Sequence, residues 1–272
     1  MKSPLISMGG KFLQRKQIVA LFPPHDTYVE VFGGAGHVIF AKPPSKVEVY
    51  NDINQELVNF FMVARDHREE LMEKLDSLPY SRALHHQWKS EPLPENDNVE
   101  RACRWFYILR SSFGGTYGAG WAYSKKRNIA QGFRSSISNI SHIKDRFKNV
   151  LIDCLDFRQI IPKYDSSETL FYLDPPYDGQ LNNEDYYGKS CNKVGIFDKQ
   201  DHIDLALTLN EIKGKIVLSY GRTPLIQELY PKDKWVWFEY QKFITSQKKK
   251  EERRQAMNEC YILNFDPNRG LL

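Results

Sequence analysis

The sequence predicts an α/β protein whose largely parallel sheet is interrupted by a helical insertion. Short apolar segments rich in β-branched and aromatic residues recur along the chain, and most are bounded by glycine, proline or asparagine. The first two, residues 27–32 and 46–50, are separated by a glycine turn and a segment that fits a strand–helix–strand unit. From about residue 54 to residue 146 the spacing of apolar residues becomes helical instead.

The individual elements follow from local patterns. Residues 8–22 have apolar side chains at helical spacing between Gly9-Gly10 and Pro23-Pro24, so we expect a helix there. After the first strand, we expect the glycine turn at residues 33–36 to open a second helix near His37. Within the insertion, residues 99–113 give the clearest amphipathic helix. Further strands are expected at residues 150–152, 170–173, 215–219, 235–239 and 260–265.

Composition excludes several classes of protein. The chain has 272 residues, 41% of them hydrophobic and 26% charged, with 38 Lys+Arg against 34 Asp+Glu and a net charge of +4. These values are typical of a globular protein and exclude a disordered or collagen-like chain. Four cysteines without C-x-x-C spacing indicate neither a zinc site nor a disulfide framework. We expect a cytoplasmic protein with no membrane partner, because no apolar run reaches the ~18–20 residues of a membrane span and the N-terminus does not resemble a signal peptide.

The most specific motif is Asp174-Pro175-Pro176-Tyr177, which directly follows the predicted strand at residues 170–173. In open α/β sheets, ligands bind at the carboxyl ends of strands. The two prolines fix φ and carry no N–H donor, so the turn presents a carboxylate, a bare carbonyl and an aromatic ring. An exocyclic amino group of a nucleobase fits this set. The Asp174 carboxylate and the Pro175 carbonyl can each accept one N–H, which frees the nitrogen lone pair for attack, and Tyr177 can stack on the base.

The second motif is the glycine turn that follows the first strand. Gly34 and Gly36 let a cofactor approach the backbone closely. The G-x-G-x-x-G fingerprint of nicotinamide enzymes fails at its last glycine, and no Gly-Lys-Ser/Thr follows, so a P-loop is excluded. Asp52 ends the next predicted strand, where an acidic side chain normally accepts hydrogen bonds from ribose hydroxyls, although a surface turn residue would fit the same position.

Together these motifs favour a nucleoside cofactor that has no pyrophosphate and is used to modify an amino group. S-adenosylmethionine fits, because its sulfonium already makes the methyl group electrophilic. We expect no metal, because the sequence has no cluster with metal-ligand spacing. The histidines are interpreted as non-catalytic.

At this point the chain resembles the Dam-like N6-adenine DNA methyltransferases over nearly its whole length. The similarity lies in residues 8–11, 29–36, 51–54 and 156–157, and in the D-P-P-Y motif, which matches letter for letter. It implies a Rossmann-like S-adenosylmethionine-dependent methyltransferase sheet. The cofactor-binding residues that it implies are Gly10, Lys11, Glu30, Phe32, Gly34, Gly36, Asp52, Asp156 and Asp174. The catalytic residues are Asp174, Pro175, Pro176 and Tyr177. Two of these assignments have simpler alternatives, since Lys11 could be solvated and Asp156 could cap a helix.

The resemblance also implies a division of the chain into two domains. Residues 1–56 and 148–272 would form the catalytic domain, and residues 57–147 an inserted, mostly helical DNA target-recognition domain. A glycine- and aromatic-rich loop in the insertion, followed by a basic cluster, would then face double-stranded DNA; a loop packed on its own domain is the alternative. The residues expected to bind DNA are Tyr117, Trp121, Lys125, Lys126 and Arg127, with Lys248 and Lys249 from a second basic cluster.

The sequence therefore predicts a site-specific DNA methyltransferase that acts on N6 of an adenine flipped out of the duplex. The alternative is a methyltransferase for another amino group, such as cytosine N4, RNA adenine or protein glutamine. A binding module without activity is disfavoured by the complete D-P-P-Y motif. A cognate restriction endonuclease is a possible partner, and a monomer or weak dimer is expected. The recognition loop differs from that of members that read GATC, so the target sequence stays open.

Overall fold

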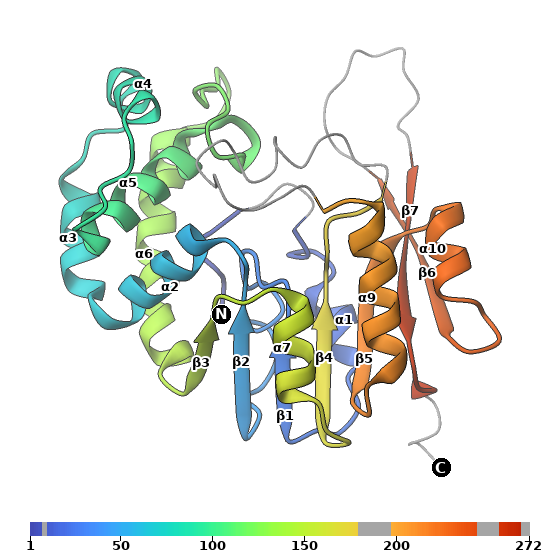
Figure 1. Ribbon diagram of the computed structural model, residues 1–272. Helices are drawn as coiled ribbons and strands as arrows, with labels where there is room; N and C mark the ends of the chain where they lie inside the picture. The colour runs from blue at the N-terminus through green and yellow to red at the C-terminus, as the bar shows by residue number, and fades with distance from the viewer. Residues whose placement is uncertain (7–9, 179–196, 244–255, 268–272) are drawn as a thin grey trace.

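The computed structural model describes residues 1–6, 10–178, 197–243 and 256–267. These residues form a seven-stranded sheet with the order β3-β2-β1-β4-β5-β7-β6 (Figure 1). The strands are β1 (Thr27–Glu30), β2 (Val47–Asn51), β3 (Val150–Asp153), β4 (Thr169–Leu173), β5 (Lys215–Gly221), β6 (Val236–Phe243) and β7 (Ala256–Leu263). Each predicted strand is therefore present, and the α/β class is confirmed.

The strand order reverses between β1 and β4. The first five strands of the order, from β3 to β5, are parallel, and β7 pairs antiparallel with β5 and with β6. Glu30, the last residue of β1, is opposite Tyr50 of β2 and Tyr172 of β4. The carboxyl ends of these three strands therefore lie together at the point where an open α/β sheet binds its ligand.

Helices cover both faces of the sheet. α7 (Phe157–Tyr164) and α9 (Lys199–Glu211) lie on one face, which Figure 1 shows in front of the strands. Alternate strand residues, such as Val29 of β1 and Phe171 of β4, face these two helices in one apolar cluster. The intervening residues Tyr28 and Leu170 belong to a second cluster on the opposite face, together with Ile18 of α1 (Arg15–Ala20). Beyond β5, α10 (Pro224–Leu229) precedes β6.

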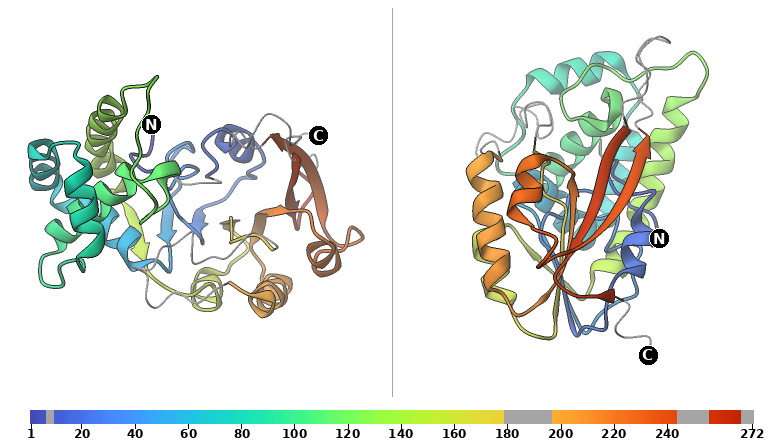
Figure 2. Two further views of the ribbon diagram at one scale, coloured as in Figure 1. Left: turned by 90° about the horizontal axis from the view of Figure 1, so that it is seen from above. Right: turned by 90° about the vertical axis from the view of Figure 1, so that its right-hand side faces the viewer.

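A helical segment joins β2 to β3. It consists of α2 (Gln55–Asp66), α3 (Arg68–Ser77), α4 (Arg82–Ser90), α5 (Asn98–Ser111), the 3-10 turn η1 (Phe113–Gly115) and α6 (Ile129–Phe147). The segment stands beside the sheet, above the ends of β2 and β3 (Figures 1 and 2). Its aromatic core is continuous with the second cluster, since Tyr50 of β2 packs on Phe61 of α2 with ring centroids 4.7 Å apart. The helical segment between β2 and β3 is thus packed on the sheet and shares a core with it.

Two expected helices differ in the structure. The expected helix over residues 8–22 is helical only as α1; residues 11–14 form turns, and part of the range lies outside the described residues. The helix expected near His37 is wrong, because the chain from Gly34 to Ala41 forms hydrogen-bonded turns and bends. Gly34 and Gly36 have positive φ, and Pro43-Pro44 follows, so the connection is too short and interrupted for a regular helix. Within the described ranges, no helix has the length and apolar character needed to cross a membrane.

Candidate active site

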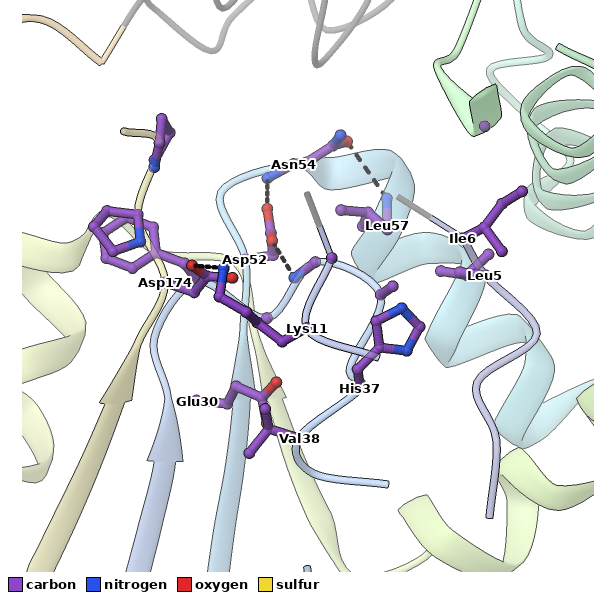
Figure 3. A pocket seen from close by; sticks show the side chains of 18 of the residues that line it. Leu5, Ile6, Lys11, Glu30, His37, Val38, Asp52, Asn54, Leu57 and Asp174 are labelled. Carbon is purple, nitrogen blue, oxygen red and sulfur yellow. Dashed lines mark hydrogen bonds and ion pairs between the residues drawn. The ribbon is translucent and has the colours of Figure 1, made fainter. Parts of the chain in front are cut away.

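A cavity opens at the carboxyl ends of β1, β2 and β4, between the sheet and the helical segment (Figure 3). The glycine turn and the D-P-P-Y turn both contribute to its wall, so the two motifs singled out in the sequence share one cavity. The sequence-predicted residues that line it are Gly10, Lys11, Glu30, Phe32, Gly34, Asp52, Asp174, Pro175, Pro176 and Tyr177.

The glycine turn is shaped by Tyr50. A Cβ at Gly33 would lie 2.3 Å from the Tyr50 ring, so no larger residue fits without displacing that ring. The Tyr50 hydroxyl donates a hydrogen bond to the carbonyl of Gly34 at 2.6 Å. Gly34 itself has φ of +48°, and a Cβ placed there would meet no atom within 4 Å. The backbone of Gly34 therefore borders open space, which a ligand can approach closely.

Asp52 lies directly beside this turn (Figure 3). Its Oδ2 accepts a hydrogen bond from the Gly34 N–H at 2.7 Å, and its Oδ1 accepts one from the Asn54 N–H at 2.8 Å. Burial raises the pKa of the Asp52 carboxyl to about 6, while the two backbone donors lower it. The carboxylate is thus held in a fixed orientation at the cavity wall by the backbone of two loops.

Glu30 contributes a second carboxyl group to the cavity wall. It is 1% exposed, and its Oε2 accepts a hydrogen bond of 2.8 Å from the Tyr28 hydroxyl. Burial raises the pKa of Glu30 to about 8, against the lowering effect of that hydrogen bond and of a backbone donor at Ile39. In this structure the group is therefore mainly protonated at neutral pH.

The D-P-P-Y turn begins at the end of β4, as the sequence predicts. The Lys11 ammonium forms an ion pair with Oδ1 of Asp174 at 2.7 Å and lies 4.9 Å from the centre of the Tyr177 ring. Lys11 is 4% exposed, so the alternative of a solvated lysine is wrong. Burial raises the pKa of the Tyr177 phenol well above its usual value, which keeps the hydroxyl protonated. In this structure the Lys11 ammonium therefore already donates to the Asp174 carboxylate, which is the acceptor expected for the target amino group.

The helical segment supplies the far wall of the cavity. Trp105 of α5 and Tyr117 line it, and their rings stack with centroids 6.3 Å apart. Tyr117, expected on the DNA side, therefore faces the cavity. Tyr172 and Glu259, which the sequence did not indicate, also line the cavity. Two-residue periodicity could have indicated Tyr172 of β4, which precedes Asp174 by two positions, but Glu259 comes from the distant strand β7.

Trp121 does not lie at an exposed loop tip. The residue is half-buried, and its ring packs on Tyr80 with centroids 4.4 Å apart and on His85 at 5.5 Å. The exposed aromatic residues of the loop are instead Phe113, 71% exposed, and Tyr123, 68% exposed. The ring of Trp121 is therefore partly covered by its own segment, whereas two other aromatic residues of the loop face solvent.

The remaining predicted site residues are distributed as follows. Lys125, Lys126 and Arg127 are exposed in a turn beside Tyr123. Asp156 is not among the lining residues; it caps α7 and pairs with Arg158, as the simpler alternative proposed. Gly36 also does not line the cavity and has φ of +67° within the turn. Lys248 and Lys249 lie outside the described residues.

Comparison with known proteins agrees with this geometry. Residues 7–253 match the family described as D12 class N6 adenine-specific DNA methyltransferase. The Type II methyltransferase M.CviBI of Paramecium bursaria Chlorella virus NC1A is 26% identical, over 86% of this chain and 87% of that protein. The Type II methyltransferase M1.LlaDCHI of Lactococcus lactis subsp. cremoris is 27% identical, over 82% of each chain. The DNA adenine methylase of Haemophilus influenzae is 22% identical, over 89% and 87%. Because the family match spans most of the sequence, the chain belongs to the D12 class of N6 adenine-specific DNA methyltransferases.

Proposed function

We propose that the cavity at the ends of β1 and β4 holds both S-adenosylmethionine and an adenine extruded from duplex DNA, and that methyl transfer to N6 takes place beside Asp174. The observation that carries this proposal is the shared cavity, in which the D-P-P-Y turn faces the glycine turn. In a protein of this family, that arrangement brings the acceptors for an amino group next to a nucleoside site.

The residues present fit the cofactor of this family. Gly34 offers backbone next to open space, and Asp52 offers two aligned carboxylate oxygens that suit the hydroxyls of a ribose. The wall carries the carboxyl groups of Glu30, Asp52, Asp174 and Glu259. Their oxygens suit the hydroxyl and amino groups of a ligand far better than the oxygens of a pyrophosphate. We assign Asp52, Gly34 and Glu30 to cofactor binding. When bound, S-adenosylmethionine supplies a methyl group that its sulfonium has made electrophilic.

The chain's own residues act on the target amino group. The Asp174 carboxylate and the Pro175 carbonyl each accept one N–H, which draws the nitrogen toward tetrahedral geometry and frees its lone pair. The Tyr177 ring stacks on the base, a contact of ~1–3 kcal/mol in other nucleic-acid complexes. Lys11 compensates the charge of Asp174 while the pocket holds no base, and it gives up or shares this carboxylate when the base enters.

The helical segment is proposed to hold the DNA. Phe113 is highly exposed and belongs to the same η1 turn as Gly115, which lines the cavity, so an aromatic surface lies near the place where a base would enter. The exposed basic turn at residues 125–127 can contact phosphates on the same segment. Extrusion of a base costs a few kcal/mol, and these backbone and stacking contacts offset it.

The test is the Asp174→Ala variant on amplified genomic DNA, which carries no methyl groups. We expect transfer of labelled methyl groups to fall below detection, while the affinity for S-adenosylhomocysteine, measured by calorimetry, stays within about threefold. Digestion to nucleosides and mass spectrometry of DNA treated with the unchanged enzyme should yield N6-methyladenine. Wild-type turnover in the variant would falsify the assignment of Asp174, and a different methylated nucleoside would contradict the assigned target.

The names of two relatives extend the proposal. Both are Type II methyltransferases, and on this ground we propose that methylation by this chain is site-specific and that a cognate endonuclease is its partner in the cell. Mapping of N6-methyladenine in DNA from cells that express the protein tests the first part. A single short sequence at the modified positions is the expected result, and modification without a common sequence would contradict it.

A further inference from the structure

The D-P-P-Y turn is joined to the end of β5 by two hydrogen bonds between side chains. The Tyr177 hydroxyl and Oγ of Ser219 lie 3.0 Å apart, and this bond is fully buried. The hydroxyl of Thr223 donates a hydrogen bond of 2.7 Å to Oδ2 of Asp178, the residue that follows Tyr177. Ser219 belongs to β5, and Thr223 caps α10 just beyond it. Both contacts therefore connect one short stretch of chain to the exit of the catalytic turn.

The two ends of the Tyr177 side chain lie in different surroundings. The tyrosine is one of the residues that line the cavity, whereas Ser219 is completely buried and is not a lining residue. The phenol is protonated, because burial raises its pKa, so it can donate to Ser219. Tyr220 supports the same ring at a centroid distance of 5.8 Å and is itself hydrogen-bonded to His202 at 2.6 Å. The hydroxyl of Tyr177 thus anchors the ring in the protein core.

The hydroxyl group of Thr223 takes part in two hydrogen bonds. Its oxygen accepts a hydrogen bond from the Ile226 N–H at 3.3 Å, which caps α10, and the same group donates to Asp178. Asp178 is therefore connected through the Thr223 hydroxyl to the first turn of α10, which begins just beyond β5. The turn is then held at three successive points: Asp174 by Lys11, Tyr177 by Ser219 and Asp178 by Thr223.

We propose that Ser219 and Thr223 are positioning residues for methyl transfer. They fix the ring of Tyr177 and the exit of the turn, and so maintain the spacing between the stacking surface and the two acceptors of the amino group. The inference rests on the proposed roles of Asp174 and Tyr177. A misplacement of 1 Å can reduce the rate of a catalysed reaction by about 100-fold, so loss of either contact is expected to lower kcat more than it changes substrate affinity.

A double-mutant cycle tests the bond to Ser219. Tyr177→Phe keeps the ring and removes its hydroxyl, and Ser219→Ala removes the partner. We expect each variant to lower the single-turnover rate on amplified genomic DNA about tenfold, with KM for DNA within twofold. The double variant is expected to be no slower than the slower single variant, because both act through one bond. Rate losses that multiply in the double variant would overturn the proposal. Single variants whose rates lie within twofold of the wild-type rate would also overturn it.

A second comparison separates anchoring of the turn from capping of α10. Thr223→Val removes both contacts, Thr223→Ser keeps both, and Asp178→Ala removes the anchor but leaves the cap. We expect equal losses of kcat in Thr223→Val and Asp178→Ala and restoration in Thr223→Ser. A loss confined to Thr223→Val would show that only the cap matters and would contradict the inference.

Control measurements distinguish a variant that does not fold, a failure of the proposed function and a failure of the positioning role. Melting curves and S-adenosylhomocysteine affinity of every variant show whether it folds, and Ser219→Cys provides a variant of similar volume if Ser219→Ala does not. Asp174→Ala is assayed in parallel. Full turnover of that variant contradicts the proposed function itself. An inactive Asp174→Ala beside a fully active Ser219→Ala contradicts only the positioning role.

Discussion

Replacement of Glu30 by glutamine isolates the energetic consequence of a buried carboxyl group in the cavity. The folded protein holds this group with a pKa of about 8, compared with 4.5 for an ordinary glutamate, chiefly because burial disfavours the charge. Since the folded-state pKa is raised, the stability associated with the bound proton is fully present below pH 4.5 and is lost as the pH rises through 8. Glutamine resembles the protonated acid, still accepts the hydrogen bond from Tyr28 and has no proton to lose.

The size of the effect follows from these two pKa values. Between them, each pH unit changes the relative stability by at most ~1.4 kcal/mol. From pH 5 to pH 7 the unfolding free energy of Glu30→Gln should therefore rise relative to wild type by up to about 3 kcal/mol, and the difference should level off above pH 8. All other titrating groups are common to both proteins and cancel in the comparison.

The assay is urea unfolding of both proteins at pH 5, 6, 7 and 8, followed by tryptophan fluorescence. Glu73→Gln, the same substitution on the exposed face of α3, is measured alongside as the matched control. A flat difference for Glu30→Gln, or one that falls between pH 5 and pH 7, would refute the argument that this carboxyl is kept protonated by burial.

Three further predictions concern the cofactor and DNA surfaces. Asp52→Asn removes the charge but keeps one acceptor for the Gly34 or Asn54 N–H, so S-adenosylhomocysteine affinity should fall about 10- to 100-fold in calorimetry, as expected for loss of hydrogen bonds to a charged group; unchanged affinity would exclude Asp52 from the site. Phe113→Ala should alter stability by less than about 0.5 kcal/mol because the ring is exposed, yet weaken duplex binding in fluorescence anisotropy by a stacking contribution of ~1–3 kcal/mol; equal affinities would remove Phe113 from the interface. Trp121→Ala should instead destabilise the fold by about 1–3 kcal/mol in urea, and a stability equal to wild type would contradict its packing on Tyr80.

The strands and the catalytic turn could be predicted because their signals are local. The apolar run at residues 169–173 forms β4, and the two prolines that follow Asp174 prevent the strand from continuing, so it ends at Leu173. The glycines at positions 33–36 similarly require a turn after β1. The carboxyl ends of parallel strands lie at one edge of the sheet, so the sequence placed both turns at that edge. That β1 and β4 are neighbours, and that the turns share a cavity, comes from the structure.

Which aromatic residues of the loop in the helical segment are covered could not be predicted in the same way. Phe113, Tyr117 and Trp121 recur at every fourth position, a helical spacing, yet the glycine-rich stretch that holds them forms no α-helix. Whether each ring is covered depends on partners distant in the sequence: Trp121 packs on Tyr80 and Tyr117 on Trp105, whereas Phe113 is exposed. Burial by such partners leaves no local signal. The same reason applies to Glu259, which reaches the cavity only because β7 pairs with β5.

The arrangement of charge in the cavity explains how its acidic groups can lie close together before ligands bind. Glu30 is protonated at neutral pH, Asp174 is paired with Lys11, and Asp52 accepts hydrogen bonds from two backbone donors. Each carboxyl is thus compensated by a different means, by a proton, a cation or backbone dipoles, and each of the first two can be exchanged for a ligand group. A cationic cofactor can replace the proton near Glu30, and a target amino group can replace the ammonium at Asp174. Ligand binding at Glu30 and Asp174 then exchanges one form of compensation for another, which keeps the energetic cost of occupying these two positions low.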